Sequence, residues 1–142
     1  MVSAIPENYP RMSPYLSVDG AGEAIEFYVD VLGANVRGRM DGPDGKVGHA
    51  ELEIGDSVLM LADIFPEANQ SSPKDLGGTP VMMMVYVEDA DATHAKALAA
   101  GATELSPVED QFYGDRSGRF VDPWDGRDGH HRRAPPRVSA MS

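Results

Sequence analysis

The sequence contains no cysteine, and this absence excludes several kinds of chemistry. Without a thiol the chain cannot form disulfides, bind a metal through thiolates or use a cysteine nucleophile. It also lacks any apolar run of the roughly 18 to 20 residues that a membrane-spanning helix needs. Its first residues have neither the basic start nor the apolar core of a signal peptide. We therefore expect a cytoplasmic protein with no membrane partner.

Basic residues are few, 12 against 23 acidic ones, so the 142-residue chain has a formal net charge of −11. The imbalance lies in the body of the chain, because 21 of the acidic and only eight of the basic residues precede Trp124. A body this acidic repels phosphate backbones, which argues against a nucleic-acid partner. Hydrophobic residues make up 42% and charged residues 25%, as in an ordinary globular protein, and we assign residues 1–142 to one domain.

The same order of elements is predicted twice along the chain. The first copy has a strand at 12–18, a helix between Asp19 as its cap and Gly33, and strands at 34–40, 47–54 and 57–62. After a loop at 63–79, the second copy has a strand at 81–87, a helix between Asp89 and Gly101, and strands at 102–106 and 115–121. Such an internal repeat predicts an α+β fold of two βαβββ modules, about 12–63 and 80–123, whose curved antiparallel sheets are each backed by a helix.

The tail at 124–142 differs in composition from the modules. It is rich in Arg, Gly and Pro, shows no apolar alternation, and its prolines Pro135 and Pro136 are unsuited to a central strand. The eighth strand is therefore in doubt, and residues beyond about Arg132 are expected to be loose or irregular. Without that strand, an open edge is expected beside residues 57–62 or 115–121. The adjacent pair His130 and His131 offers a candidate metal site in this tail.

Several short motifs carry a family resemblance over roughly residues 5–124. They are Ser-Pro-Tyr-Leu at 13–16, Ile-Glu-Phe-Tyr at 25–28, Leu-Gly-Ala at 32–34, His-Ala-Glu-Leu at 49–52, the run at 55–61, Gly-Gly-Thr-Pro at 77–80 and the run at 110–118. With the repeated module, they resemble the vicinal-oxygen-chelate superfamily, which holds glyoxalase I, extradiol dioxygenases and bleomycin-resistance proteins, and within it the PhnB-like branch. This fold hosts several chemistries as well as plain binders.

The resemblance also indicates where a metal would be held. Metal enzymes of that superfamily use His, Gln or Glu on the first and last strands of the modules, and the matching positions here are Ser13, Leu59 and Met82. These side chains do not suit a hard or borderline cation. The favoured function is therefore a metal-free small-molecule binder of bleomycin-resistance type, with no cofactor. A divalent-metal-dependent lyase, isomerase or dioxygenase of glyoxalase type and a degenerate non-catalytic paralogue remain the alternatives.

The expected ligand pocket is apolar and aromatic and lies on the concave faces of the sheets. Met82 and Met84 share one face of their strand, and Tyr15 shares a face with Ser13. The predicted lining is Ser13, Tyr15, His49, Leu59, Met82, Met84, Phe112, Tyr113 and Arg116, with no catalytic residue assigned. Such a pocket, in so acidic a body, predicts a small ligand that is planar or apolar and neutral or cationic.

Two histidines of the body allow different interpretations. His49 alternates with Glu51 and Glu53 along one strand, so it either serves as an acid/base group of the cavity or faces solvent beside two solvated carboxylates. His94 lies among alanines in the second helix and is expected at the surface. Because open sheet edges favour pairing between chains, we also expect a homodimer, with Trp124 packed near the junction.

Overall fold

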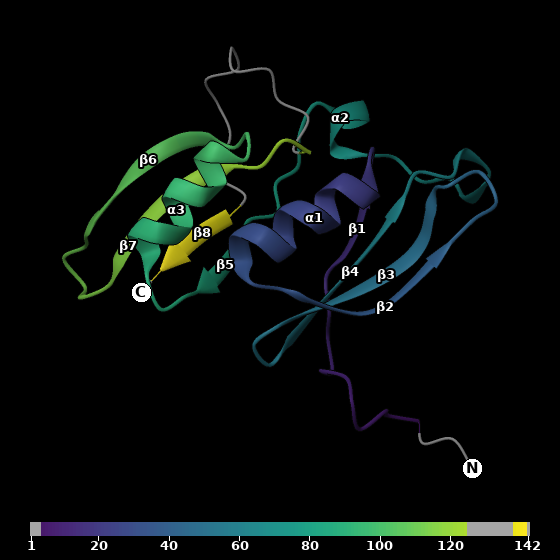
Figure 1. The fold of residues 1–142 in the computed structure, drawn as a ribbon, viewed down its shortest axis with the longest axis horizontal. Helices are drawn as coiled ribbons and strands as arrows, with labels where there is room; N and C mark the ends of the chain where they lie inside the picture. The colour runs from purple at the N-terminus through teal and green to yellow at the C-terminus, as the bar shows by residue number, and fades with distance from the viewer. Residues whose placement is uncertain (1–3, 125–137, 142) are drawn as a thin grey trace.

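The chain folds into two βαβββ modules, as the repeat predicts (Figure 1). The computed structural model describes residues 4–124 and 138–141. Module one consists of β1 (Tyr15–Val18), α1 (Ala21–Leu32), β2 (Asn35–Asp41), β3 (Val47–Ile54) and β4 (Ser57–Asp63). Module two consists of β5 (Met83–Tyr86), α3 (Ala90–Ala99), β6 (Thr103–Asp110), β7 (Arg116–Val121) and β8 (Val138–Met141). The segment between the modules carries the 3-10 turn η1 (Pro66–Ala68) and the short helix α2 (Pro73–Leu76).

Both sheets have the same strand order, β1-β4-β3-β2 in module one and β5-β8-β7-β6 in module two. In each sheet the first strand of the module runs parallel to the last, and the remaining pairs are antiparallel. The expectation of an open edge beside β4 or β7 is wrong. Each of these strands has a neighbour on both sides, so the sheet edges are β1, β2, β5 and β6.

The strand that the tail composition left in doubt is formed by the end of the chain. β8 lies between β5 and β7 and pairs with both, with Met83 opposite Val138 and Ser117 opposite Met141. It follows the two prolines, so they do not interrupt it, and the expectation of an irregular tail beyond Arg132 does not hold for this segment. The pair His130 and His131 lies outside the described residues.

Helix α1 is capped from another strand, which corrects the sequence expectation of Asp19. The residue before the helix is Gly20, whose left-handed backbone (φ 97°) has no capping side chain. Instead one carboxylate oxygen of Asp63, at the end of β4, accepts hydrogen bonds from the backbone N–H groups of Gly20 (3.0 Å) and Ala21 (2.8 Å). Its other oxygen accepts from Val47 N–H at 2.8 Å, so one side chain ties α1 to β3 and β4.

Helix α3 begins where the sequence predicts, but its histidine is buried rather than at the surface. The Asp89 side chain caps the helix by accepting from Ala92 N–H at 3.0 Å. His94 packs edge-on against Phe120, and its Nε2 lies 2.9 Å from a carboxylate oxygen of Glu104. A Cβ atom at Gly118 would lie 3.0 Å from His94 Nδ1, so this glycine lets the helix approach the sheet closely and bury the imidazole.

Strand β6 is longer than the sequence suggests. Residues 107–114 carry turn-forming residues, yet the strand continues through Pro107 to Asp110. β6 lies at the edge of its sheet, where a residue without an N–H is tolerated. The pairing with β7 shifts register between Ser106 and Glu109, which accommodates the proline within the strand.

A single hydrophobic core extends across both modules. Its buried members include Phe27 and Tyr28 of α1, Leu52 of β3 and Phe120 of β7, and helices α1 and α3 contact each other. Trp124, just past β7, is buried against module one, with its ring centroid 5.5 Å from that of Phe27. The tryptophan therefore lies at the module junction.

We expect the tail strand to be required for module two to fold. Ending the chain at Arg137 removes β8 and leaves the backbone groups of β5 and β7 without their central partner, at a cost above about 4 kcal/mol. Thermal unfolding by circular dichroism should show a much lower midpoint or no cooperative transition. A chain that lacks only Ser142 is the matched control, and equal midpoints for the two truncations would contradict the pairing of β8.

Candidate functional site

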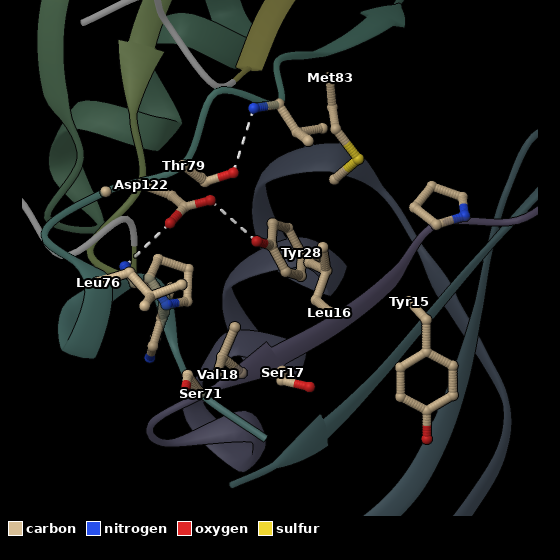
Figure 2. A pocket seen from close by; sticks show the side chains of 15 residues that line it. Tyr15, Leu16, Ser17, Val18, Tyr28, Ser71, Leu76, Thr79, Met83 and Asp122 are labelled. Carbon is tan, nitrogen blue, oxygen red and sulfur yellow. Dashed lines mark hydrogen bonds between the residues drawn. The ribbon is translucent and has the colours of Figure 1, made fainter. Parts of the chain in front are cut away.

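A cavity of about 400 Å³ lies at the junction of the modules (Figure 2). It is bounded by edge strand β1, by the connecting segment between the modules and by the residues after β7. Its lining is Pro14, Tyr15, Leu16, Ser17, Val18, Tyr28, Ser71, Pro73, Leu76, Gly78, Thr79, Val81, Met83, Asp122 and Trp124. Most of these side chains are apolar, and a few hydroxyl groups and one carboxylate lie among them. This composition is typical of sites that bind small organic molecules.

The carboxylate of Asp122 is the charged group of this cavity. The buried hydroxyl of Tyr28, on α1, donates a hydrogen bond to Asp122 Oδ2 at 2.9 Å, and Figure 2 shows the two side chains pointing toward each other. The backbone N–H of Trp124 donates to Asp122 Oδ1, also at 2.9 Å. Both carboxylate oxygens are thus engaged by groups of the protein, which keeps the charged side chain in one orientation in the cavity wall.

A second cavity, of about 350 Å³, is formed by the start of β4, the chain before β1 and strand β5. It is lined by Met12 and Leu59 on one side and by Met84 and Tyr86 on the other. Of the predicted ligand residues, Tyr15 lines the larger cavity, while Leu59 and Met84 line this one.

The concave face of module one carries a chain of hydrogen-bonded side chains. The hydroxyl of Tyr15 lies 2.9 Å from Nδ1 of His49, and Nε2 of His49 lies 2.9 Å from Oε2 of Glu51. Tyr15 is also part of the lining of the junction cavity, and Figure 2 shows its ring directed away from Tyr28 and Asp122. The structure thus brings together two of the predicted residues, Tyr15 and His49, and Glu51 lies beside the second nitrogen of His49.

Further contacts fix the ionisation of Glu51. The hydrogen bonds from His49 and from the hydroxyl of Tyr9 (2.7 Å) hold the pKa of this carboxyl below its usual range. The same hydrogen bond to Glu51 raises the pKa of Tyr9. Arg37 completes the group: its guanidinium lies 4.4 Å above the Tyr9 ring and 3.8 Å from Glu51 Oε1. Glu51 is therefore an ionised hydrogen-bond acceptor.

The three candidates near the start of β7 lie away from both cavities. Phe112 and Tyr113 are exposed in the turn between β6 and β7, where their rings pack edge to face with centroids 5.1 Å apart. Arg116 forms two hydrogen bonds to Asp91 in the first turn of α3 (2.7 and 2.9 Å) and one to Asp110 (3.1 Å). The guanidinium lowers the pKa of Asp91, and its contacts join the helix to the sheet.

The remaining candidates lie on or beside strands β5, β4 and β1. Met84 and Met82, which precedes β5, are exposed, whereas Met83 and Val85 pack against the core, so the two exposed methionines lie away from the core. Leu59, in contrast, is a buried member of the core, opposite Leu52 on β3. Ser13 precedes β1 and is partly buried.

The residues present do not fit a divalent metal. At the positions that match the family's metal ligands, Leu59 is part of the core, and Ser13 and Met82 offer a hydroxyl and a thioether. Among the residues that the structure describes, no three His, Asp or Glu side chains converge as a metal site would require. His49 and Glu51 are already hydrogen bonded to each other, so we derive no chemistry from a metal.

Sequence reasoning missed most of the larger cavity. In the sequence pattern, Tyr28 is one of several apolar positions of a helix. Asp122 and the residues of the connecting segment show no periodic pattern. The run Gly-Gly-Thr-Pro at 77–80 and the sequence Asp122-Pro123-Trp124 are the features that could have pointed to it. Within the described part of the chain, none of the helices is both long and apolar enough to cross a membrane.

Comparison with known proteins identifies the superfamily to which this chain belongs. The model of the Glyoxalase/Bleomycin resistance protein/Dioxygenase superfamily matches residues 12–127, and the chain belongs to this superfamily. A protein of Mycobacterium bovis described as uncharacterized is 46% identical over 125 residues, which cover 86% of this chain and 80% of that protein.

Solved structures agree on the fold. A gene product of Arabidopsis thaliana superposes with a TM-score of 0.68 at 24% identity, covering 94% of this chain and 97% of that one. A glyoxalase/bleomycin resistance protein from a Streptomyces species superposes with a TM-score of 0.58 at 21% identity, covering 92% and 97%. Membership of the superfamily supports a protein that binds small molecules.

The contact between Tyr28 and Asp122 should contribute measurably to stability. Replacing Tyr28 with Phe removes the hydroxyl and leaves one carboxylate oxygen short of a donor, so we expect a loss of about 1 to 3 kcal/mol. Urea unfolding followed by tryptophan fluorescence measures this loss directly, because Trp124 packs against the Tyr28 ring. The exposed Tyr113→Phe variant is the control, and equal stabilities of the two variants would show that the hydrogen bond contributes nothing.

Proposed function

We propose that this protein binds a small organic molecule in the junction cavity and does so without a divalent metal. The observation that supports this most directly is the cavity of about 400 Å³, which is walled mainly by apolar side chains around the carboxylate of Asp122. Burial of apolar ligand surface there supplies affinity, at about 25 cal/mol per Å² before the costs of binding are subtracted. The hydroxyl groups and the carboxylate supply orientation.

The lining favours a ligand that is planar or apolar and neutral or cationic. Asp122 faces the cavity with a negative charge, and the chain as a whole carries −11, so an anionic ligand would be repelled. Leu16, Met83 and Trp124 offer apolar surface, and methionine adapts readily to flat ligands. We further assign the chain to the PhnB-like branch on its sequence motifs, and we place it in the cytoplasm as part of the same proposal.

A neutral planar dye should bind in the cavity, and a bulky substitution in the cavity wall should weaken that binding. Val81 is an exposed residue at the cavity wall, so Val81→Trp inserts bulk there without disturbing the core. Titration with Nile red, followed by fluorescence, should give one saturable site in the wild type and at least tenfold weaker binding in this variant, a loss of about 1.4 kcal/mol.

The control variant is Leu105→Trp, which adds the same side chain at an exposed position of β6. It should bind Nile red like the wild type, and treatment with a metal chelator should leave the affinity unchanged. Equal affinity in both tryptophan variants would place the binding site elsewhere, and loss of binding after chelation would favour the metal-dependent alternative.

We also propose a homodimer in which the apolar face of β5 is covered by a second copy of the chain. Met84 and Tyr86 are exposed on this edge strand, and the exposed Met12 lies with them around the second cavity. Large apolar side chains gathered on an unpaired edge are typical of an interface. A two-fold pairing of identical chains is the commonest way to cover such a surface.

Light scattering at micromolar concentration should therefore give twice the mass of one chain. A lysine at position 84 places a charge in the proposed interface, so Met84→Lys should shift the equilibrium toward single chains. Val36→Lys, at an exposed position of β2, is the matched control and should stay dimeric. A wild-type protein that is strictly monomeric would refute this assembly.

A further inference from the structure

We propose that Tyr15 and His49 form a proton-transfer pair, with Glu51 as its positioning residue, and that this site binds and ionises the hydroxyl of a planar phenol. Of its three residues, Tyr15 also belongs to the lining of the junction cavity, whereas His49 and Glu51 do not. The inference rests on the hydrogen bonds among these side chains and not on the ligand proposed for that cavity. The inference starts from three side chains of two strands, β1 and β3, joined end to end by hydrogen bonds.

The direction of these hydrogen bonds follows from the chemistry of the partners. An ionised carboxylate can only accept, so His49 Nε2 donates its proton to Glu51 Oε2 across 2.9 Å. In the neutral imidazole the other nitrogen is then an acceptor, so the hydroxyl of Tyr15 donates to Nδ1, also across 2.9 Å. This is the arrangement of a hydroxyl, a base and a group that orients the base.

Burial decreases along the chain of side chains from the carboxylate to the hydroxyl. The side chain of Glu51 is 14% exposed, whereas Tyr15 is 49% exposed and is open to an incoming molecule. The groups that face Glu51 from the neighbouring segments are Tyr9 of the N-terminal arm and Arg37 of β2. Both favour its ionised form, so the orienting carboxylate keeps its charge.

Proton balance is maintained without any co-reactant. A phenol donates its proton to Tyr15 Oη while the Tyr15 proton passes to His49 Nδ1, so the products are a phenolate and an imidazolium. The imidazolium keeps its Nε2–H bond to Glu51, which stabilises the new positive charge. Return of the proton along the same path restores the neutral pair, so the site can both remove and deliver a proton.

The surroundings of Tyr15 favour an acid whose anion is stabilised within its own ring system. Arg37 is the cation beside this network, and it is already engaged by Glu51, Glu53 and the Tyr9 ring. It offers no free charge to a developing anion. A phenolate delocalises its charge into the aromatic ring, and Met60, paired with both Tyr15 and Glu51 across the sheet, offers an apolar surface for that ring.

The reactivity of the tyrosines toward N-acetylimidazole tests the activated hydroxyl. This reagent transfers its acetyl group to a phenolic oxygen, imidazole leaves, and the phenolic proton must be taken up by a base. Tyr86 and Tyr113 serve as internal references, because they are 70% and 55% exposed, more than Tyr15. Peptide mass spectrometry should show acetylation of Tyr15 at least about tenfold faster than of either reference, since His49 takes up its proton.

Variants separate the base from simple accessibility. His49→Asn keeps an acceptor close to Tyr15 but cannot take up a proton, so Tyr15 should react no faster than the references. Glu51→Gln should give an intermediate rate, because the imidazole loses its charged partner. The proposal would be overturned if Tyr15 reacted more slowly than Tyr86 and Tyr113 in the wild type, or if its rate were unchanged in His49→Asn. The wild-type comparison does not depend on the folding of any variant.

The ligand class is tested with 4-nitrophenol, whose phenolate absorbs visible light. At a pH below the pKa of the free probe, the wild-type protein should increase the phenolate absorbance in a saturable manner, and Tyr15→Phe and His49→Asn should abolish this increase. No increase with the wild type would overturn the assignment of a phenol. Leu105→Trp, at an exposed position of β6, should leave the signal intact. Nile red binding by the same wild-type protein reports the junction cavity separately, so failure of this site and failure of the junction cavity are distinguishable.

Discussion

The hydrogen bond from Tyr28 to Asp122 joins the two modules at the point where the larger cavity forms. Tyr28 belongs to α1 of module one, and Asp122 follows β7 of module two, 94 residues further along the chain. The carboxylate also accepts from Trp124 N–H, whose indole ring packs on Phe27 and Tyr28. A partly buried carboxylate is stable there because a hydroxyl and a backbone N–H donate hydrogen bonds to its oxygens. Without this contact, the Asp122 carboxylate would no longer be held in one orientation in the cavity wall.

Edge strand β1 connects the junction cavity with the proton-transfer site. Leu16 and Val18 pack against the core next to the cavity, whereas the Tyr15 ring faces the opposite way, toward His49. Successive side chains of a strand point to opposite faces of the sheet, so four residues can contribute to both places. A shift of one residue in the pairing of β1 with β4 would exchange the two faces. The register, which sets Tyr15 opposite Met60, is therefore a requirement for both sites.

The modules share a topology but differ in how their helices pack. In module one, α1 buries large side chains such as Phe27 and Tyr28, and a carboxylate from β4 caps its start. In module two, α3 buries small residues, Ala90 and Ala97, and lies close to β7 over Gly118. The close approach encloses His94, whose Nδ1 has no hydrogen-bond partner among the described residues. In the same module, Arg116 of β7 forms ion pairs with Asp91 of α3 and with Asp110 of β6.

Local sequence determined the order and limits of most elements, and only the tertiary structure decided the sites. Alternation predicted β3 at 47–54, and glycines at 33 and 101 marked the ends of both helices, because these signals depend on the nearest few residues. In contrast, the cap from Asp63, the partner of Arg116 and the cavity beside Asp122 arise from residues far apart in sequence. The pairing of Tyr15 with His49 depends on strand order, since β4 lies between β1 and β3 and brings the two side chains together across it.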